Sequence, residues 1–148
     1  MNNFKDDVTV IFVGNNKPFS LAIKLFTFSH FSHCAVLDDK GYVIDTTLTT
    51  GVRKIHFDEW KKHYNNFEFT FFPVESREKS LAFFNAQVGK AYDPLGILSF
   101  ILRKDYENKD KYFCSELIAK GLGIKYKPYR LSPAFLLNLY GTLKGWII

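Results

Sequence analysis

Two residues far apart in the sequence, Cys114 and His33, carry the side chains of nucleophilic thiol chemistry. Cys114 begins a segment, residues 114–122, whose apolar residues recur with the spacing of a short amphipathic helix, and Gly121 is the expected stop. The first N–H groups of a helix are unpaired and partially positive, so a cysteine placed there favours the thiolate form. His33 begins the apolar segment 33–37, which is expected to be a strand. A cysteine at a helix start and a histidine on a strand are the parts of a thiol hydrolase.

Asp45 is the expected third member of this set. It lies in the apolar run 42–46, where a carboxylate is costly unless it has a partner. Because the turn 38–41 joins this run to the segment that begins with His33, the two side chains are expected at roughly matching depths on adjacent strands. A carboxylate beside an imidazole fixes its tautomer and stabilises its charged form. The alternative is that Asp45 ends its strand and caps the turn at 46–47.

The second cysteine, Cys34, directly follows His33. Side chains alternate along a strand, so a His33 that faces the Cys114 helix predicts a Cys34 that is turned away as a small buried residue. A disulfide between Cys34 and Cys114 is the alternative. The N-terminus is polar and acidic and does not resemble a secretory leader, which predicts a cytoplasmic protein with free thiols.

Two further residues are candidates for contact with a substrate. Tyr92 lies between two expected helices, and its hydroxyl is placed to meet a developing oxyanion; the alternative is a packed aromatic residue, which the residues alone favour. Ser115 supplies, with Cys114, backbone N–H groups at a helix start that suit an oxyanion hole, whereas its side chain is a polar residue of the first turn. The four histidines and two cysteines form no metal-binding motif, so neither a metal nor a cofactor is expected.

The spacing of apolar residues predicts an α+β domain with a small antiparallel sheet packed against helices. Strands are expected at residues 8–13, 33–37, 42–46, 51–55 and 67–74, with a closing strand at 146–148. Helices are expected at residues 20–26, 76–88, 95–102 and 114–122, with a short one capped by Asp58 and a last one from Ser132-Pro133 to Gly141.

The composition indicates one packed domain, residues 1–148. The chain is 47% hydrophobic and 18% aromatic, which argues against disorder. The net charge of +5 is spread along the chain, apart from Lys61-Lys62 and residues 125–130, and predicts a solvated surface rather than contact with an anionic polymer or membrane. No signature of nucleic-acid binding is present. The longest apolar run, 95–102, is shorter than the roughly 20 residues of a membrane span, which leaves peripheral lipid contact.

The ordered motifs resemble one known family. Segments at residues 31–37, 42–45, 88–93, 113–118 and 131–133 are similar to those of the YiiX-like branch of the NlpC-type cysteine peptidases, which have a circularly permuted papain-like fold with histidine before cysteine in the chain. The lecithin:retinol acyltransferase group shares this permutation. The resemblance implies Cys114 as nucleophile, His33 as general base, Asp45 as the orienting residue, and Tyr92 near the pocket.

Three functions follow from this resemblance. The first is a cysteine hydrolase that cleaves an amide bond in a small peptide or a cell-wall-derived fragment through an acyl-cysteine. The second is a lipid acyltransferase or thioesterase that uses the same acyl-cysteine, which the aromatic residues and the basic segment 125–130 would suit. The third is a papain-like module that binds a peptide or a partner protein without catalysis. The oligomeric state is not predicted.

Overall fold

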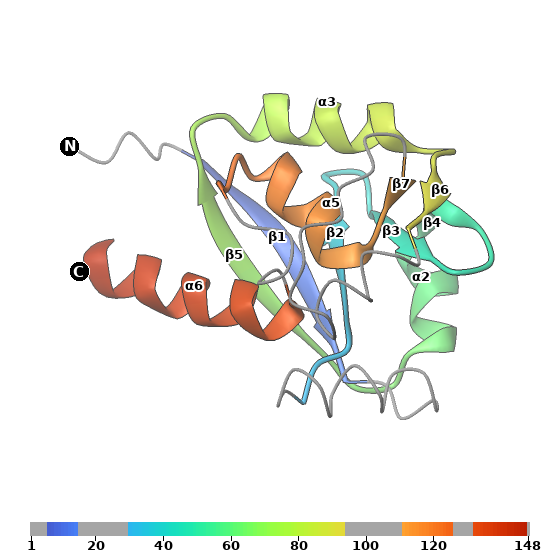
Figure 1. Cartoon of the computed structure of the whole chain (residues 1–148), viewed down its shortest axis with the longest axis horizontal. Helices are drawn as coiled ribbons and strands as arrows, with labels where there is room; N and C mark the ends of the chain where they lie inside the picture. The colour runs from blue at the N-terminus through green and yellow to red at the C-terminus, as the bar shows by residue number, and fades with distance from the viewer. Residues whose placement is uncertain (1–5, 15–29, 94–110, 126–131, 148) are drawn as a thin grey trace.

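The computed structural model of the chain describes residues 6–14, 30–93, 111–125 and 132–147 (Figure 1). The helices expected at residues 20–26 and 95–102 lie outside these ranges. Within them, the structure is a mixed α+β arrangement in which a five-stranded antiparallel sheet is packed against helices, as the sequence predicts. The same ranges contain no helix long and apolar enough to cross a membrane.

The sheet has the strand order β4-β3-β2-β1-β5, and all five strands fall where the sequence places them. Their bounds are β1 Asp6–Val13, β2 His33–Leu37, β3 Tyr42–Thr47, β4 Gly51–His56 and β5 Phe67–Val74. β1 lies between β2 and β5, and every pairing is antiparallel. Strands that follow one another in the sequence therefore pair along most of the sheet, with one crossover that brings β5 beside β1.

The alternation of side chains gives the sheet two different buried faces. The first face carries Val10 and Phe12 of β1, Val36 of β2 and Ile44 of β3, all without exposed area. The second face carries a smaller apolar cluster made of Ile11, Val13, Ala35, Val43 and Trp60. Both faces of the central strands are thus covered, which explains why β1 and β2 read as nearly continuous apolar runs.

Helices cover the two faces unequally (Figure 1). Side chains of α3 (Arg77–Gln87), α5 (Cys114–Gly121) and α6 (Pro133–Ile147) pack on the first face. The second face is covered by α2 (Phe57–Trp60) and the short 3-10 turn η1 (Lys61–His63). A two-residue parallel pair, β6 (Ala91–Tyr92) with β7 (Lys111–Tyr112), lies beside β4 and leads into α5.

The predicted caps of two helices are confirmed. The Ser76 hydroxyl accepts the N–H of Lys79 at the start of α3, and Gly89 follows that helix with a φ of 95°. The Ser132 hydroxyl accepts the N–H of Phe135 at 3.0 Å at the start of α6. At α2 the prediction is wrong: the cap is the His56 ring, which accepts from the N–H of Asp58, because Asp58 already lies inside the first turn.

Of the two glycines predicted to stop helices, only Gly121 does. Gly121 is the last residue of α5 and lies against the Phe84 ring of α3, and the left-handed residue that follows the helix is Gly123, with a φ of 71°. Gly141 lies inside α6, which continues to Ile147, so residues 146–147 are helical and the closing strand is wrong. Glycine in a helix interior costs only about 1 kcal/mol relative to alanine, and helix-forming neighbours outweigh that cost.

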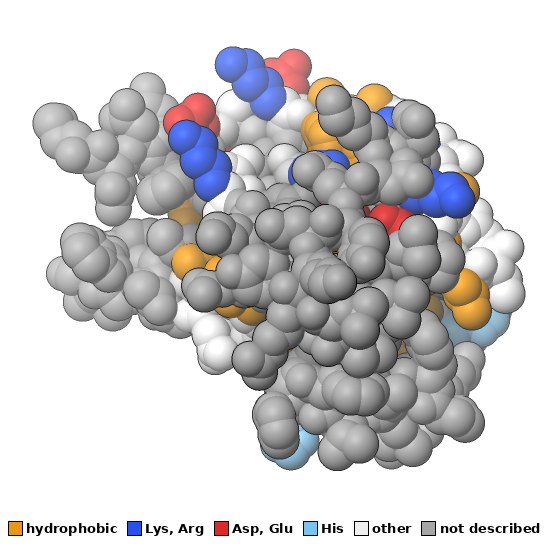
Figure 2. Space-filling model, viewed as in Figure 1, with side chains coloured by type: hydrophobic (Ala, Val, Ile, Leu, Met, Phe, Trp, Pro, Cys, Tyr) orange, Lys and Arg blue, Asp and Glu red, His pale blue; other side chains and the backbone are white. Residues whose placement is uncertain are grey.

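Several basic side chains of the described residues pair with acidic ones. Lys61 bonds Asp58 and Lys62 bonds Glu59, each at 2.6 Å across one helical turn, in pairs that solvent reaches. On the face shown in Figure 2, the coloured Lys and Arg side chains lie apart from one another, with other side chains among them. This pattern agrees with a solvated surface rather than one continuous basic patch.

Candidate active site

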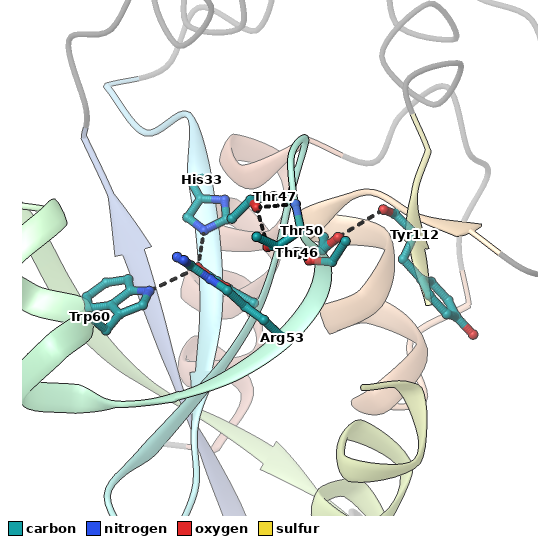
Figure 3. A network of polar contacts seen from close by, with 9 residues as sticks. His33, Thr46, Thr47, Thr50, Arg53, Trp60 and Tyr112 are labelled. Atoms are coloured by element: carbon teal, nitrogen blue, oxygen red, sulfur yellow. Dashed lines mark hydrogen bonds and ion pairs between the residues drawn. The ribbon is translucent and has the colours of Figure 1, made fainter. Parts of the chain in front are cut away.

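The carboxylate of Asp45 is completely buried, and three side chains donate hydrogen bonds to it. His33 Nε2 lies 3.1 Å from Oδ2, and Trp60 Nε1 lies 2.9 Å from the same oxygen. Arg53 reaches both oxygens, with Nε 2.7 Å from Oδ1 and Nη2 3.2 Å from Oδ2. In Figure 3 the side chains of His33, Arg53 and Trp60 point toward one another around this carboxylate. The expected partnership of His33 with Asp45 is therefore present in the structure.

The register of the sheet explains this convergence. Asp45 of β3 is paired with Arg53 of β4, so the two side chains lie on the same face. On the other edge of β3, Val36 of β2 pairs with Ile44. One residue further in the same antiparallel register, residue 35 is opposite Asp45. His33 is thus a diagonal neighbour of Asp45, two residues further along β2, and its ring spans the offset. The sequence places the two at matching depth, which is correct to within this offset.

Aromatic rings hold the imidazole plane. The His33 ring is stacked on Tyr64 at a centroid distance of 5.6 Å and an angle of 21°. Tyr64 in turn packs on Trp60 at 4.5 Å. The His33 side chain keeps 13% of its area exposed, so the ring is enclosed but remains accessible at one edge. Stacking and the Asp45 hydrogen bond together fix the orientation of the ring, which leaves Nδ1 free of the carboxylate.

Cys114 is the first residue of α5, in the position that the sequence predicts. The segment before it is anchored on several sides: the Tyr112 carbonyl accepts from Thr46 Oγ1 at 3.3 Å and from the Asp93 N–H at 3.0 Å. Figure 3 shows the first of these bonds. The Tyr112 hydroxyl donates to Gln87 Oε1 at 3.0 Å. Strand β3, helix α3 and the β6 segment therefore fix where α5 begins.

The first turn of α5 is capped from inside the helix. Its N-cap residue, Phe113, has no side-chain acceptor, but the Glu116 carboxylate accepts the backbone N–H of Phe113, which is the second half of a capping box. The first intrahelical bond runs from the Leu117 N–H to the Phe113 carbonyl at 3.0 Å. The N–H groups of Cys114 and Ser115 precede that bond, and the partial positive charge of the helix start acts on the Cys114 sulfur.

His33 and Cys34 both reach Cys114, although they are consecutive strand residues. The Cys114 sulfur interacts with the His33 ring and with the Cys34 thiol, and these interactions shift the pKa values of all three groups. Cys34 is buried and lies on the opposite face from His33, as predicted, but α5 packs on the face of Cys34, so the prediction that Cys34 is turned away from α5 is wrong. Cys34 belongs to the first face of the sheet, on which α5 packs, and contacts Cys114 directly. His33 is the first residue of β2, so its ring passes around the beginning of the strand to reach the same sulfur.

The contacts between these groups favour their charged forms. The Cys34 hydrogen bond, opposed by burial and assisted by the His33 hydrogen bond and charge, holds the pKa of Cys114 well below that of an ordinary thiol. Burial acts to lower the pKa of His33, but hydrogen bonds to Asp45 and Cys114 raise it well above its usual value. For Asp45, burial is likewise outweighed by His33 and Arg53, so the carboxyl pKa lies far below its usual range. A thiolate beside an imidazolium is the expected resting state.

Tyr92 and Ser115, the two residues expected near the substrate, both lie close to Cys114. Tyr92 belongs to β6 and is partly buried; burial raises the pKa of its phenol first, and the negative charges of Cys114 and Asp93 add to this. The hydroxyl therefore stays protonated and keeps its capacity to donate. Ser115 follows Cys114 in the first turn and is fully buried. These positions agree with the sequence analysis, while their contact with a substrate stays a prediction.

Comparison with known proteins gives a structural likeness. No family model matches the chain, and no curated protein matches it. Among solved structures, it is similar to the crystal structure of the metalloprotein YiiX from Escherichia coli O157:H7, described as DUF1105, with a TM-score of 0.57 and 25% identity. The likeness covers 80% of this chain and 64% of that one, so the chain spans less than two thirds of its structural neighbour. The finding supports a YiiX-like α+β architecture.

The word metalloprotein describes YiiX. Within the described ranges of this chain, no three His, Cys, Asp or Glu side chains are grouped so that they could hold a metal ion. The carboxylate of Asp45 already accepts from Arg53 and Trp60 as well as from His33. The side chains at this site do not fit a metal.

Several site residues were missed by the sequence analysis. Arg53 had a usable signal: it follows Asp45 across a short hairpin at a spacing that puts both on one face. Cys34 was expected to point away from α5 because His33 was assumed to face that helix, whereas α5 packs on the face of Cys34. Trp60 and Tyr64 gave no signal beyond being aromatic, since their approach depends on how α2 and η1 fold back over the second face.

Proposed function

We propose that this chain is a cysteine hydrolase that cleaves an amide bond through an acyl-cysteine intermediate, on a domain of the circularly permuted papain-like kind. The observation that carries the proposal is the chain of contacts from Cys114 at a helix start, through the His33 ring, to the buried carboxylate of Asp45. The likeness to YiiX supports it at the level of architecture. The order of histidine before cysteine in the sequence agrees with the permuted arrangement.

The acylation step uses the thiolate and the imidazolium. The Cys114 sulfur donates its electron pair to the carbonyl carbon, and the carbonyl π electrons move to the oxygen. Backbone N–H groups at the start of α5, with the Tyr92 hydroxyl, are the proposed donors to this oxyanion. When the intermediate collapses, the C–N bond breaks and the amine leaves with the proton from His33. A thioester on Cys114 and a neutral imidazole remain.

The deacylation step reverses the roles. His33 takes a proton from a water molecule, whose oxygen attacks the thioester carbon. Collapse of this second intermediate breaks the C–S bond and releases a carboxylic acid, while the thiolate and imidazolium return. Asp45 stabilises the positive charge of His33 in the resting enzyme and again when His33 takes the proton from water, and it holds the ring in place. Arg53 and Trp60 keep Asp45 ionised. The proposed substrate is a small peptide or a cell-wall-derived fragment.

The test is transfer of an acyl group to Cys114 from p-nitrophenyl acetate, followed by peptide mapping. Wild type is expected to gain one acetyl group on Cys114, with a burst of p-nitrophenolate, because the nucleophile is activated. Cys114→Ser should gain none, and His33→Ala should acylate on the order of 10²- to 10⁴-fold more slowly. The matched histidine control is His56→Ala, since His56 is exposed and caps α2 away from the site; its rate should equal wild type.

The substrate class is then separated with two further probes. Release of a free amine from short peptides supports the amide hydrolase, whereas a stable fatty-acyl mass shift on Cys114 after incubation with a short-chain phospholipid supports a lipid acyltransferase or thioesterase. If Cys114 neither acylates nor reacts with iodoacetamide faster than a free thiol at neutral pH, the proposal of an enzyme is wrong and a binding module takes its place.

A further inference from the structure

Cys34 is a second thiol beside the proposed nucleophile, and the mechanism above does not use it. It is the second residue of β2 and has no exposed area, while Cys114 keeps 3% of its area exposed. Both belong to one apolar cluster on the first face of the sheet, where α5 packs directly on β2. Each thiol shifts the pKa of the other, and both are free thiols. Two interacting thiols therefore lie on the two sides of the helix–sheet contact.

This placement suits a covalent bond between them. A disulfide needs an S–S distance of about 2.05 Å and Cα atoms roughly 4.4–6.8 Å apart, on elements that do not have to move far. Both cysteines lie in one buried cluster, and α5 already rests on β2. Small rotations of the two side chains are the expected adjustment. Unlike a cysteine placed at random in a core, Cys34 has one thiol neighbour, and that neighbour is the proposed nucleophile.

The two thiols have different chemical roles available to them. Interactions with Cys34 and His33 lower the pKa of Cys114, so Cys114 is the thiolate that reacts with an oxidant. Cys34 has no exposed area, and burial, followed by its interactions with Cys114 and the negative charge of Asp45, raises the pKa of its thiol. A reactive thiolate beside a protonated thiol is the arrangement of a peroxidatic and a resolving cysteine.

We propose that Cys34 is a resolving cysteine that closes a reversible disulfide with Cys114 after a hydroperoxide has oxidised it. The inference rests on the proposed function in one respect: the disulfide removes the nucleophile and so switches the hydrolase off. It also protects Cys114 from irreversible oxidation, because a sulfenic acid that is captured at once by a thiol does not proceed to the sulfinic acid.

Disulfide formation takes two steps, oxidation of Cys114 and attack by Cys34. In the first, the Cys114 thiolate attacks one oxygen of the hydroperoxide; an S–O bond forms, the O–O bond breaks, the sulfur loses two electrons, and the leaving hydroxide or alkoxide takes up a proton. In the second, the Cys34 sulfur attacks the sulfur of the sulfenic acid; an S–S bond forms, the S–O bond breaks, and the hydroxyl leaves as water with the Cys34 proton. An external dithiol returns both residues to thiols.

The experiment treats the reduced full-length protein with hydrogen peroxide, with and without dimedone, and then maps both cysteines by mass spectrometry under non-reducing conditions. Wild type should give an intramolecular Cys34–Cys114 peptide pair, little dimedone adduct, and full recovery of both thiols with dithiothreitol. In Cys34→Ser the dimedone adduct should accumulate on Cys114. Without dimedone, excess peroxide should oxidise the sulfenic acid further to the sulfinic acid, which dithiothreitol does not reduce. Cys34→Ala repeats the test without a hydroxyl and guards against a packing defect in one variant.

Two results overturn the proposal. One is equal dimedone labelling of Cys114 in wild type and both Cys34 variants; the other is a disulfide that forms only between two chains. Neither readout uses a substrate, so the outcome is independent of the hydrolase proposal. A Cys34–Cys114 disulfide in a protein that acylates nothing would sink the proposed function alone, and acylation of Cys114 without disulfide formation would sink this inference alone.

Discussion

At the scale of single residues, charge balance explains how a fully buried carboxylate is tolerated at the candidate site. Asp45 has no exposed area, yet its pKa is far below normal, because the positive groups around it outweigh the cost of burial. Read along the contacts, the charges alternate: Cys114 negative, His33 positive, Asp45 negative and Arg53 positive, with a net charge of zero. Removing any one member leaves its neighbour with an uncompensated charge, so each has a measurable effect.

The first prediction concerns the pH dependence of alkylation. Iodoacetamide reacts with the thiolate, so its rate on Cys114 should rise with an apparent pKa well below the 8.5 or so of a free cysteine. In His33→Ala this depression should shrink, because the hydrogen bond and positive charge of the imidazolium are lost. The measurement is the rate of adduct formation at Cys114 between pH 4 and 10, with about pH 8.5 as the reference point.

Cys114→Ser serves as the background in this assay, since its remaining thiol is the enclosed Cys34. A wild-type profile that follows a free cysteine would contradict the resting ion pair. An unchanged low pKa in His33→Ala would show that the helix start and Cys34 set the pKa without the imidazole, and would contradict the role given to His33.

The second prediction isolates the indole hydrogen bond. Trp60→Phe keeps an aromatic ring against Tyr64 but removes the donor to Asp45, which lies at 2.9 Å. A hydrogen bond to a charged group contributes about 1.5–3 kcal/mol, and a loss of this size in the free energy of unfolding is expected, measured by urea denaturation. When Trp60→Phe is introduced into the Asp45→Asn variant, it should lower the free energy of unfolding clearly less, because the amide that replaces the carboxylate has no charge that the indole would stabilise. Equal costs in the two backgrounds would mean that Trp60 acts through packing alone.

At the scale of elements, the start of α5 is positioned by its neighbours rather than by its own sequence. The Tyr112 carbonyl is bonded from β3 and from the β6 segment, and the far end of α5 rests on α3, where Gly121 meets Phe84. A side chain at Gly121 would collide with that ring, so this glycine permits the close approach of the two helices. The angle at which α5 presents Cys114 therefore depends on a contact about two turns away.

The third prediction tests this contact. Gly121→Ala should gain helix propensity, about 1 kcal/mol, but lose more through overpacking against Phe84, so a net destabilisation of roughly 1–2 kcal/mol is expected together with slower alkylation of Cys114. Combining it with Phe84→Leu should relieve the collision, so the double variant should lose less stability than the sum of the two single ones. Thermal unfolding and the alkylation rate are the measurements.

Gly123→Ala is the matched control. Gly123 has a φ of 71° and open space around it, so alanine there meets backbone strain of about 1–2 kcal/mol but no neighbour. Its cost should be unaffected by Phe84→Leu, and Cys114 should react at the wild-type rate. If Phe84→Leu relieves both glycine variants alike, or neither, the contact does not position α5.

Whether a helix or strand could be predicted from the sequence depends on whether local patterns or tertiary contacts determine it. The strands and the turn at residues 38–41 depend on local alternation and turn chemistry, and they lie where the sequence predicts. The stop at Gly121 is correct, whereas the stop at Gly141 was wrong, because a glycine ends a helix when the chain turns left-handed there, which depends on tertiary contacts. Cys34 was misplaced for a similar reason: its side chain alternates with that of His33 as predicted, but which face α5 covers depends on tertiary packing.

At the scale of the whole molecule, the site joins the two layers of the fold. His33 and Asp45 belong to the second face of the sheet with Trp60, whereas Cys114 comes from a helix on the first face. They meet at the beginning of β2, where the sheet no longer separates the layers. The sequence named the right residues from their chemistry, but the meeting of two layers at a strand end depends on how α5 and α2 pack, and no local pattern reports that.

Because His33 and Cys114 meet, the pH dependence of the free energy of unfolding depends on both groups together. The pKa of His33 is raised by folding, so its contribution is complete below about pH 6.5 and is lost as the pH rises through the folded pKa. The pKa of Cys114 is lowered, so its contribution is complete above about pH 8.5 and is lost as the pH falls through the folded pKa. Between these limits, unfolding moves one proton from the imidazole to the thiol and exchanges none with solvent.

The fourth prediction is therefore a plateau. The free energy of unfolding of wild type, minus that of the double variant His33→Gln with Cys114→Ser, should be constant between about pH 6.5 and pH 8.5 and should fall on either side by up to about 1.4 kcal/mol per pH unit. Asp45 is retained in both proteins and acts only below about pH 3.9, where its depressed pKa lets stability fall as the pH falls. The measurement is urea denaturation across this range. A difference that changes by about 1.4 kcal/mol per pH unit between pH 6.5 and 8.5 would mean that only one of the two groups is charged in the folded protein. A lone thiolate or a lone imidazolium must exchange its proton with solvent on unfolding.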